Sequence, residues 1–278
     1  MRQPVRGYSL EIIVNYLNFY SPIPVMVVTA LRSALYMLFM TVTVIPWGLC
    51  SFLLFPLPKR TAYSIITFWT TIAVWGGRVI CGIRYEVVGR ENIPDNAKYG
   101  GVILLSKHQS RYETLLFRTL FHWMCYVYKR ELHYMPFFGW GIALCDMIPI
   151  DRARGREALD QVAAKGKIKL EQGWNMIMFP EGTRVDPGQK KRYKIGGTHL
   201  SVATRVPVVP IAHNAGDVWP RGSFLKRPGL VTVSIGPPIH PEGMSAEEQM
   251  KKVEGWIENE MVTRFPHQYG KALATTQN

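Results

Sequence analysis

The sequence predicts an α/β protein in which a mixed, largely parallel central sheet is flanked by helices and preceded by an N-terminal membrane-associated helical segment. Long uncharged apolar stretches dominate the chain before residue 80. From about residue 84 onward, short apolar runs rich in Val and Ile alternate with helical stretches instead. We therefore expect membrane-anchoring helices in residues 1–83, a globular domain in residues 84–265 and a polar tail in residues 266–278.

The first uncharged apolar stretch spans residues 33–58 and lies between Arg32 and the pair Lys59 and Arg60. It is longer than the roughly 20 residues that cross a bilayer. Pro46 falls midway along it and predicts a kink, because proline removes a helical hydrogen bond. We expect a helix that inserts into a membrane.

A second apolar stretch spans residues 61–77 and is marginal in length for a complete span. It carries Phe68, Trp69 and Trp75, aromatic residues that favour the membrane interface. Two arrangements fit: a single span followed by an interfacial helix, or a bent hairpin that dips into one leaflet with both ends on the same side. Basic residues around both stretches favour the hairpin, and a buried core helix is the alternative without a membrane.

The globular region contains short apolar runs that predict strands buried on both faces. These runs are residues 85–88, 102–105, 124–128, 147–150, 176–179, 206–211 and 230–235. Helical patterns lie between several of them, including residues 154–172. The last helix should begin at Ser245, because Glu248 three residues later completes a capping box. Its predicted apolar face consists of Met250, Val253, Ile257 and Met261.

The chain is basic and apolar at the same time. Its net charge is +13, and charged residues make up only 19%, against about 25% in a typical soluble domain. A basic balance suits nucleic acid, an anionic membrane surface or an acidic protein. No nucleic-acid-binding signature accompanies it, so we expect membrane lipids and no nucleic acid, with an acidic acyl-carrier protein as a compatible second partner. The four cysteines form no C-x-x-C pair and do not support a zinc site.

Residues 106–113 carry the first candidate chemistry. His108 follows a predicted strand and precedes a helix, at the edge where open α/β sheets build sites. A neutral imidazole can take a proton from an attacking alcohol, and a carboxylate on its other nitrogen orients it. Glu113 can serve if His108 lies in the loop and Glu113 in the first helical turn. Alternatively, His108 is structural and Glu113 only caps the helix with Ser110.

Residues 179–184 read F-P-E-G-T-R and follow another predicted strand. The glycine-containing turn exposes backbone N–H groups, and Arg184 suits bidentate binding of a phosphate. Glu181 is placed to orient that arginine or to hold a substrate hydroxyl. An ordinary polar turn with an internal Glu181–Arg184 pair is the alternative.

Two further segments also contain predicted strands. In residues 148–152, I-P-I-D-R, Arg152 offers a second cation for the same phosphate, and a surface ion pair with Asp151 is the alternative. Residues 206–211, V-P-V-V-P-I, contain no ionisable group and are expected to shape the wall of a site.

In this order, the four segments resemble the motifs of the glycerolipid acyltransferase family, typified by 1-acylglycerol-3-phosphate acyltransferases. The family pattern is H-x-x-x-x-D, an I-D-R segment, F-P-E-G-T-R and V-P-I-V-P. The stretches at 129–140 and 193–197 also resemble the family, so the resemblance covers roughly residues 84–240. The apolar N-terminal segments are similar to the family's membrane-anchoring helices.

The resemblance implies transfer of a fatty acyl group from an acyl-carrier-protein or coenzyme A thioester to the free hydroxyl of lysophosphatidic acid, giving phosphatidic acid. It implies His108 as general base and Glu113 as the residue that orients it. The implied phosphate- and head-group-binding residues are Glu181, Gly182, Thr183, Arg184, Arg152 and Lys129. No metal or redox cofactor is expected. The implied location is the inner or cytoplasmic membrane, with the catalytic domain on the cytoplasmic face.

Glu113 departs from the family pattern, which usually has Asp at this position. Glutamate is one methylene longer, so the loop must place it slightly further from His108. A His–Glu pair at this spacing also resembles the lipid A acyltransferases, so another lysolipid, such as an ornithine-type lipid, stays open as the acceptor. A thioesterase would leave the arginines without a role, and a membrane-anchored scaffold would leave the His–Glu pair unexplained.

Overall fold

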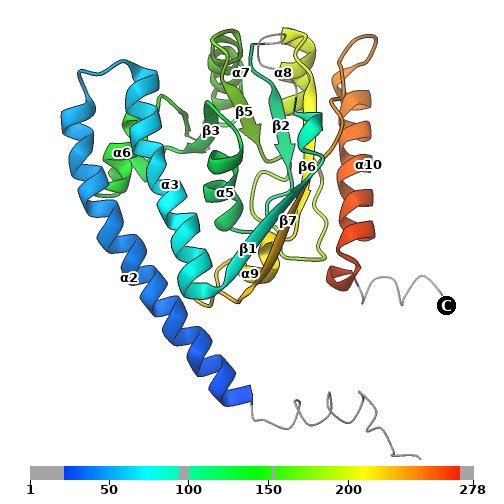
Figure 1. Cartoon of the computed structure of the whole chain (residues 1–278). Helices are drawn as coiled ribbons and strands as arrows, with labels where there is room; N and C mark the ends of the chain where they lie inside the picture. The colour runs from blue at the N-terminus through cyan, green and yellow to red at the C-terminus, as the bar shows by residue number, and fades with distance from the viewer. Residues whose placement is uncertain (1–21, 94–99, 152–153, 270–278) are drawn as a thin grey trace, which may run out of the picture.

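The computed structural model describes residues 22–93, 100–151 and 154–269. Within them, a hairpin of two long helices precedes an α/β domain built on one central sheet (Figure 1). The predicted fold class is therefore confirmed.

In the described part of the chain, the sheet has seven strands in the order β1-β7-β6-β2-β5-β3-β4. The strands are β1 (Ile83–Val88), β2 (Ile103–Ser106), β3 (Met124–Lys129), β4 (Ile148–Ile150), β5 (Asn175–Met178), β6 (Val208–His213) and β7 (Gly229–Ile235). Neighbouring strands run parallel except β6 and β7, which pair antiparallel. Each predicted apolar run contributes to one of these strands.

The outer strand β1 does not have the predicted burial on both faces. Its residues Arg84, Tyr85 and Glu86 are exposed, whereas every residue of β2 and β6 is buried. β1 lies at an edge of the sheet, and polar residues on an edge strand discourage pairing with another chain. The apolar run at residues 85–88 does not reveal that β1 is an edge strand, because the strand order depends on contacts with the distant strand β7. The core is centred on β2 and β6.

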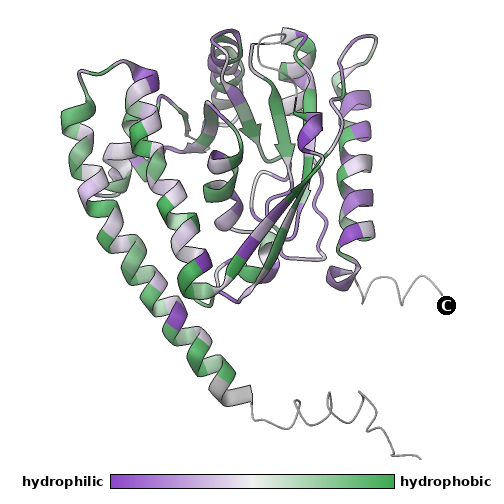
Figure 2. Ribbon diagram, viewed as in Figure 1, coloured by the Kyte–Doolittle hydropathy of each residue, from purple (hydrophilic) through white to green (hydrophobic). Residues whose placement is uncertain are grey.

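The two apolar stretches form helices α2 (Pro22–Leu54) and α3 (Lys59–Cys81), which lie side by side. Each is long and apolar enough to cross a membrane by length and composition. The apolar window of α2 is only 11% buried, and Figure 2 shows apolar residues along its length, whereas that of α3 is 44% buried. The reason is that α3 packs one face against α5 (Tyr112–Leu120). The alternative of a buried core helix therefore holds for one face of α3.

The hairpin is integrated into the domain rather than loosely attached. Tyr36 of α2 and Tyr63 of α3 are fully buried members of the main hydrophobic core. The Tyr36 hydroxyl donates to the carbonyl of Ala73, and the Tyr63 hydroxyl accepts from the backbone N–H of Met124 at the start of β3. The sheet and the hairpin consequently share one core.

The other α-helices among the described residues of the domain are α6 (Phe138–Leu144), α7 (Gly155–Glu171), α8 (Gly196–Thr204), α9 (Ala215–Val218) and α10 (Ala246–Arg264). Ser245 caps α10 and forms the predicted capping box with Glu248. All four residues of its predicted apolar face are buried. Figure 2 shows polar residues along its outer side. The helix thus packs as its sequence predicts.

The predicted polar tail begins too early. Residues Pro266–Gln268 form a short 3₁₀ helix, and Tyr269 is buried. The Gln268 side chain donates to Asp217 and accepts from Gln109. These contacts tie the segment to the loop that holds His108, a long-range relationship that local polarity does not reveal. Residues 270–278 lie outside the described part of the chain.

Candidate active site

The parallel strands β6, β2, β5, β3 and β4 all end at one edge of the sheet. His108 follows β2, and the 179–184 turn follows β5, its direct neighbour. Parallel strands thus bring together two segments that are about 70 residues apart in sequence, at the edge where α/β folds build their sites.

His108 lies in the loop between β2 and α5, and Glu113 lies in the first turn of α5. The Nδ1 atom of His108 is 2.7 Å from Oε1 of Glu113. Glu113 is fully buried, whereas the His108 side chain keeps 16% of its exposure. The pair therefore joins a buried carboxylate to a partly exposed imidazole. His108 lies in the loop and Glu113 in the first helical turn, as the sequence analysis required.

The charge of Glu113 decides which ring nitrogen of His108 carries the proton. Burial opposes ionisation of Glu113, but hydrogen bonds from His108 and Ser110 outweigh it and hold its pKa below the ordinary 4.5. An ionised carboxylate can only accept hydrogen bonds, so Nδ1 of His108 donates. Nε2 then holds the lone pair and is the nitrogen able to accept a proton.

Backbone N–H groups of the loop are held by two carboxylates. Oε1 of Glu113 also accepts from the N–H groups of Gln109 (3.1 Å) and Ser110 (2.9 Å). Oε2 of Glu181 accepts from the N–H of His108 at 2.9 Å. Glu113 therefore binds both His108 and the backbone of the loop before α5. The N-cap of α5 is Arg111, with no side-chain cap, so the predicted capping by Ser110 is not observed.

Further contacts fix the remaining sides of the loop. The carbonyl of His108 accepts from the N–H of Val185 at 2.7 Å. His213 Nδ1 accepts from the N–H of Ala215, so its Nε2–H donates to the carbonyl of Lys107 at 2.8 Å. Burial lowers the pKa of His213 and favours its neutral form. His213 is thus a structural histidine.

The 179–184 turn lies directly against the imidazole. The rings of Phe179 and His108 are stacked, with centroids 3.8 Å apart and planes at 16°. The N–H of Gly182 donates to the carbonyl of Phe179, and its φ of +71° is a left-handed conformation that favours glycine. A Cβ at this position would lie 2.9 Å from Nζ of Lys194. Gly182 therefore shapes the turn, with a lysine close above it.

Glu181 does not occupy the position that the resemblance implies. Its side chain is fully buried, and its partners are Lys107, whose Nζ lies 2.8 Å from Oε1, and the N–H of His108. It therefore supports the His108 loop from inside the domain. Sequence reasoning missed Lys107 because a lysine beside a histidine ordinarily reads as a solvated surface residue.

Arg184 is half-buried and lies among other arginines. Burial, Arg111 and Arg221 lower its pKa, and Glu113 acts in the opposite direction. Nη1 of Arg221 donates to the carbonyl of Arg184 at 2.9 Å. Like charges gathered in this way favour binding of an anion. Arg111 lies within the His108 motif and Arg221 follows β6, so only the fold reveals their proximity to Arg184.

The structure does not place every predicted phosphate-binding residue beside the pair. Thr183 is half-buried in the same turn as Arg184. Lys129 is exposed at the end of β3, and β5 separates β3 from β2, so it lies roughly 10 Å across the sheet from the strand of His108. Arg152 lies outside the described residues.

The family model named Acyltransferase matches residues 84–214, which include the His108 loop and the 179–184 turn. A Pseudomonas aeruginosa protein named 1-acyl-sn-glycerol-3-phosphate acyltransferase is 42% identical over 246 residues, which cover 87% of this chain and 94% of the relative. This chain belongs to the acyltransferase family. The human 1-acyl-sn-glycerol-3-phosphate acyltransferase alpha is 29% identical, over 68% of this chain and 66% of its own.

The fold of this acyltransferase is similar to the crystal structure of the Thermotoga maritima 1-acyl-sn-glycerophosphate acyltransferase PlsC. The TM-score is 0.69 and the identity 26%, with 83% of this chain and 93% of the other covered. The family assignment thus rests on agreement between sequence motifs, relatives and fold.

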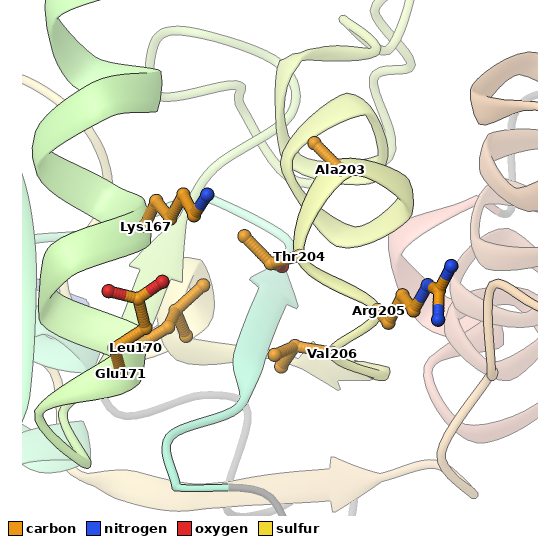
Figure 3. A pocket seen from close by; sticks show the side chains of 7 residues that line it. All are labelled: Lys167, Leu170, Glu171, Ala203, Thr204, Arg205 and Val206. Atoms are coloured by element: carbon orange, nitrogen blue, oxygen red, sulfur yellow. The ribbon is translucent and has the colours of Figure 1, made fainter.

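A cavity of about 310 Å³ in the acyltransferase lies between α7 and α8 (Figure 3). Its lining includes Lys167 and Glu171 of α7, and Thr204, Arg205 and Val206. It lies beside the amino end of β6, whereas His108 follows the carboxyl end of the parallel strand β2. The cavity is therefore at the opposite edge of the sheet and takes no part in the site.

Proposed function

We propose that this acyltransferase moves a fatty acyl group from an acyl-carrier-protein or coenzyme A thioester to the free hydroxyl of lysophosphatidic acid, giving phosphatidic acid. The observation that carries the proposal is the His108–Glu113 pair beside Arg184. The pair suits deprotonation of an alcohol, and the arginine suits a phosphate on the same molecule. The name of the 42% identical relative supports this acceptor.

The reaction follows from the protonation states of the pair. Nε2 of His108 takes the proton of the acceptor hydroxyl as its oxygen attacks the thioester carbonyl. Glu113 stabilises the imidazolium that forms. When the tetrahedral intermediate collapses, the carbon–sulfur bond breaks and the imidazolium returns the proton to the leaving thiolate. The steps need no metal or redox cofactor, because thioester cleavage drives the transfer.

Positive groups around the pair would hold the acceptor's phosphate. Arg184 is the central group, and Arg111 and Arg221 are close enough to interact with its charge. Lys194 lies above the turn at Gly182. We keep Thr183, Arg152 and Lys129 in the proposed head-group site, with Lys129 and Arg152 on the side of β3 and β4. Glu181 and Gly182 shape the site instead of contacting the phosphate.

The helical hairpin would place this site at a membrane. Exposed apolar residues along α2 suit contact with lipid, whereas α3 has one face on the protein. A helix covered by protein on one face fits insertion into one leaflet better than a lipid-enclosed span, so we favour the hairpin with both ends on the same side. We place the catalytic domain on the cytoplasmic face, where acyl thioesters are available.

The test uses purified protein in detergent with radiolabelled acyl thioesters of coenzyme A and of acyl-carrier protein. The acceptors are lysophosphatidic acid, lysophosphatidylglycerol, lyso-ornithine lipid and phosphate-free monoacylglycerol. We expect acylation of lysophosphatidic acid, and a loss of about 100- to 10,000-fold in rate for His108→Ala. His122→Ala is the matched control, because His122 is an exposed histidine in the loop before β3, at the end of the sheet opposite to His108.

Each outcome has a distinct meaning. Preference for another lysolipid would reject lysophosphatidic acid as the acceptor and keep the reaction class. Release of free fatty acid without a lipid product would favour a thioesterase. Lysophosphatidic acid acylation that survives His108→Ala would reject His108 as the base. No product with any acceptor, in an assay where the Pseudomonas relative is active, would favour a membrane-anchored scaffold.

A further inference from the structure

A buried network of charges connects the last helix of the domain to the catalytic loop. Nζ of Lys107 lies 2.8 Å from Oε1 of Glu181 and 2.9 Å from Oε1 of Glu258. The side chains of Lys107 and Glu181 are fully buried, and that of Glu258 is 13% exposed. The hydroxyl of Tyr193 donates to the same oxygen of Glu258 at 2.8 Å. One lysine thus bridges two carboxylates inside the protein.

The network ends at the proposed general base. The second oxygen of Glu181, Oε2, accepts from the backbone N–H of His108 at 2.9 Å. Glu258 therefore contacts Lys107, Lys107 contacts Glu181, and Glu181 contacts His108. Glu258 lies in α10, outside the residues 84–214 that match the family model. The ion pair between Lys107 and Glu258 joins residues that are 151 positions apart in the sequence.

The position of Glu258 on α10 is fixed by packing. Its neighbour Ile257 and the residues Val253 and Met261 are buried in the hydrophobic core. The capping box at Ser245 fixes the start of the same helix. Rotation of α10 would pull these apolar side chains out of the core, so Glu258 presents its carboxylate to Lys107 from a rigid element.

The charges of the network depend on one another. Burial alone would lower the pKa of Lys107, but Glu181 and Glu258 together outweigh burial and raise it. Lys107 therefore stays protonated between the two carboxylates, while burial raises the pKa of Glu181 and Lys107 opposes that rise. The close contact of Lys107 Nζ with Oε1 of Glu181 holds that side chain in place. Buried ion pairs contribute little net stability, because desolvation offsets their attraction. A role in fixing geometry accounts better for two buried charged groups and a partly buried one beside the catalytic loop.

We propose that Glu258 is a positioning residue that acts on His108 through Lys107 and Glu181. With Glu258 in place, Lys107 has one orientation, Glu181 is held at the N–H of His108, and the imidazole faces the acceptor hydroxyl. Without it, Lys107 and Glu181 have room to rearrange and the loop at His108 loses its fixed position. This inference rests on the proposed role of His108 and adds α10 to the catalytic apparatus.

The experiment compares Glu258→Gln with Glu254→Gln in the full-length protein. Glutamine keeps the size of Glu258 and an acceptor for Tyr193 but removes the charge that holds Lys107. Glu254 lies one turn earlier in α10 and pairs on the surface with Lys190 at 3.2 Å. We expect Glu258→Gln to lower kcat by about 10- to 100-fold with little change in KM, the size of effect that a small misplacement of catalytic groups produces. Glu254→Gln should match wild type.

A double-mutant cycle shows whether the effect passes through Lys107. We expect Lys107→Met to lower kcat at least as much as Glu258→Gln, and the double variant to be no slower than Lys107→Met alone. Additive losses would contradict the proposal, because the two residues would then act separately. All kcat values are measured well below the Tm of each variant. A purely structural role would lower Tm and leave kcat unchanged, and this outcome would overturn the inference.

The acceptor in this experiment is whichever lysolipid wild-type protein acylates fastest. The positioning role is therefore tested even if the preferred acceptor is not lysophosphatidic acid. If wild type is active but His108→Ala is equally active, the proposed function of His108 fails, and the inference fails with it. If His108→Ala is inactive and Glu258→Gln equals wild type, only the inference fails.

Discussion

Oε1 of Glu113 lies 2.7 Å from Nδ1 of His108, although the family pattern that this sequence resembles has the shorter aspartate at this position. The extra methylene is accommodated because Glu113 lies in the first turn of α5 and points back toward the loop. The same oxygen accepts from the N–H groups of Gln109 and Ser110. The longer side chain thus binds the imidazole and the backbone of the loop before the helix at once.

Substitutions of Glu113 separate its charge from its length. Glu113→Gln removes the charge that stabilises the imidazolium, so we expect kcat to fall by at least about 100-fold. Glu113→Asp keeps the charge but withdraws the carboxylate by one methylene, so it should retain more activity than glutamine. Acyl-transfer rates at saturating substrate measure both. Equal activity of Glu113→Gln and wild type would show that the carboxylate charge has no catalytic role.

The ionisation of Glu113 also predicts a pH dependence of stability. Its folded pKa lies below the ordinary 4.5, so the folded state favours the ionised form. The resulting stabilisation is present above the unfolded pKa and is lost as pH falls through the folded pKa. We expect the free energy of unfolding to decline more steeply in wild type than in Glu113→Gln below about pH 5. Chemical denaturation in detergent at a series of pH values gives the two slopes, and parallel slopes would contradict an ionised Glu113.

The arginines around Arg184 predict an effect on acceptor binding. Arg221→Gln removes an exposed guanidinium beside Arg184. We expect KM for lysophosphatidic acid to rise by about 10-fold with kcat little changed, since charge-assisted contacts to phosphate are lost in substrate and transition state alike. Arg227→Gln is the control, because Arg227 is an exposed arginine of the same loop. A similar rise in KM for both variants would indicate only a general loss of positive charge.

The sequence predicted the strands, the His108–Glu113 pair and the α10 capping box because each depends on residues close together in the chain. Apolar runs of four to six residues and an S-x-x-E pattern are local signals. The buried state of Lys107 and Glu181 could not be predicted, because Glu258 contacts Lys107 only after α10 packs on the sheet. The contact between Arg221 and Arg184 depends on the order of β6, β2 and β5 in the same way.

The exposed apolar side of α2 predicts how the protein associates with membranes. Leu38 is 60% exposed, so Leu38→Glu places a charge where we expect lipid. This variant should bind anionic vesicles more weakly in co-sedimentation, whereas its acyl-transfer rate in detergent should equal that of wild type. Val262→Glu introduces the same charge at an exposed apolar position of α10 and should bind like wild type. Equal binding by Leu38→Glu would show that this side of α2 does not contact lipid.

Gly182 offers a test of how the 179–184 turn supports activity. Its φ of +71° is strained for any residue with a Cβ, so Gly182→Ala should cost about 1–2 kcal/mol of stability. The new methyl would also meet Nζ of Lys194, but this flexible end can move aside. We expect a lower Tm together with reduced activity, because relaxation of the turn displaces Arg184. Gly196→Ala is the control, since a Cβ there meets no atom within 4 Å. A Gly182→Ala protein with a lowered Tm and full activity would show that the turn tolerates relaxation without moving the groups that bind substrate.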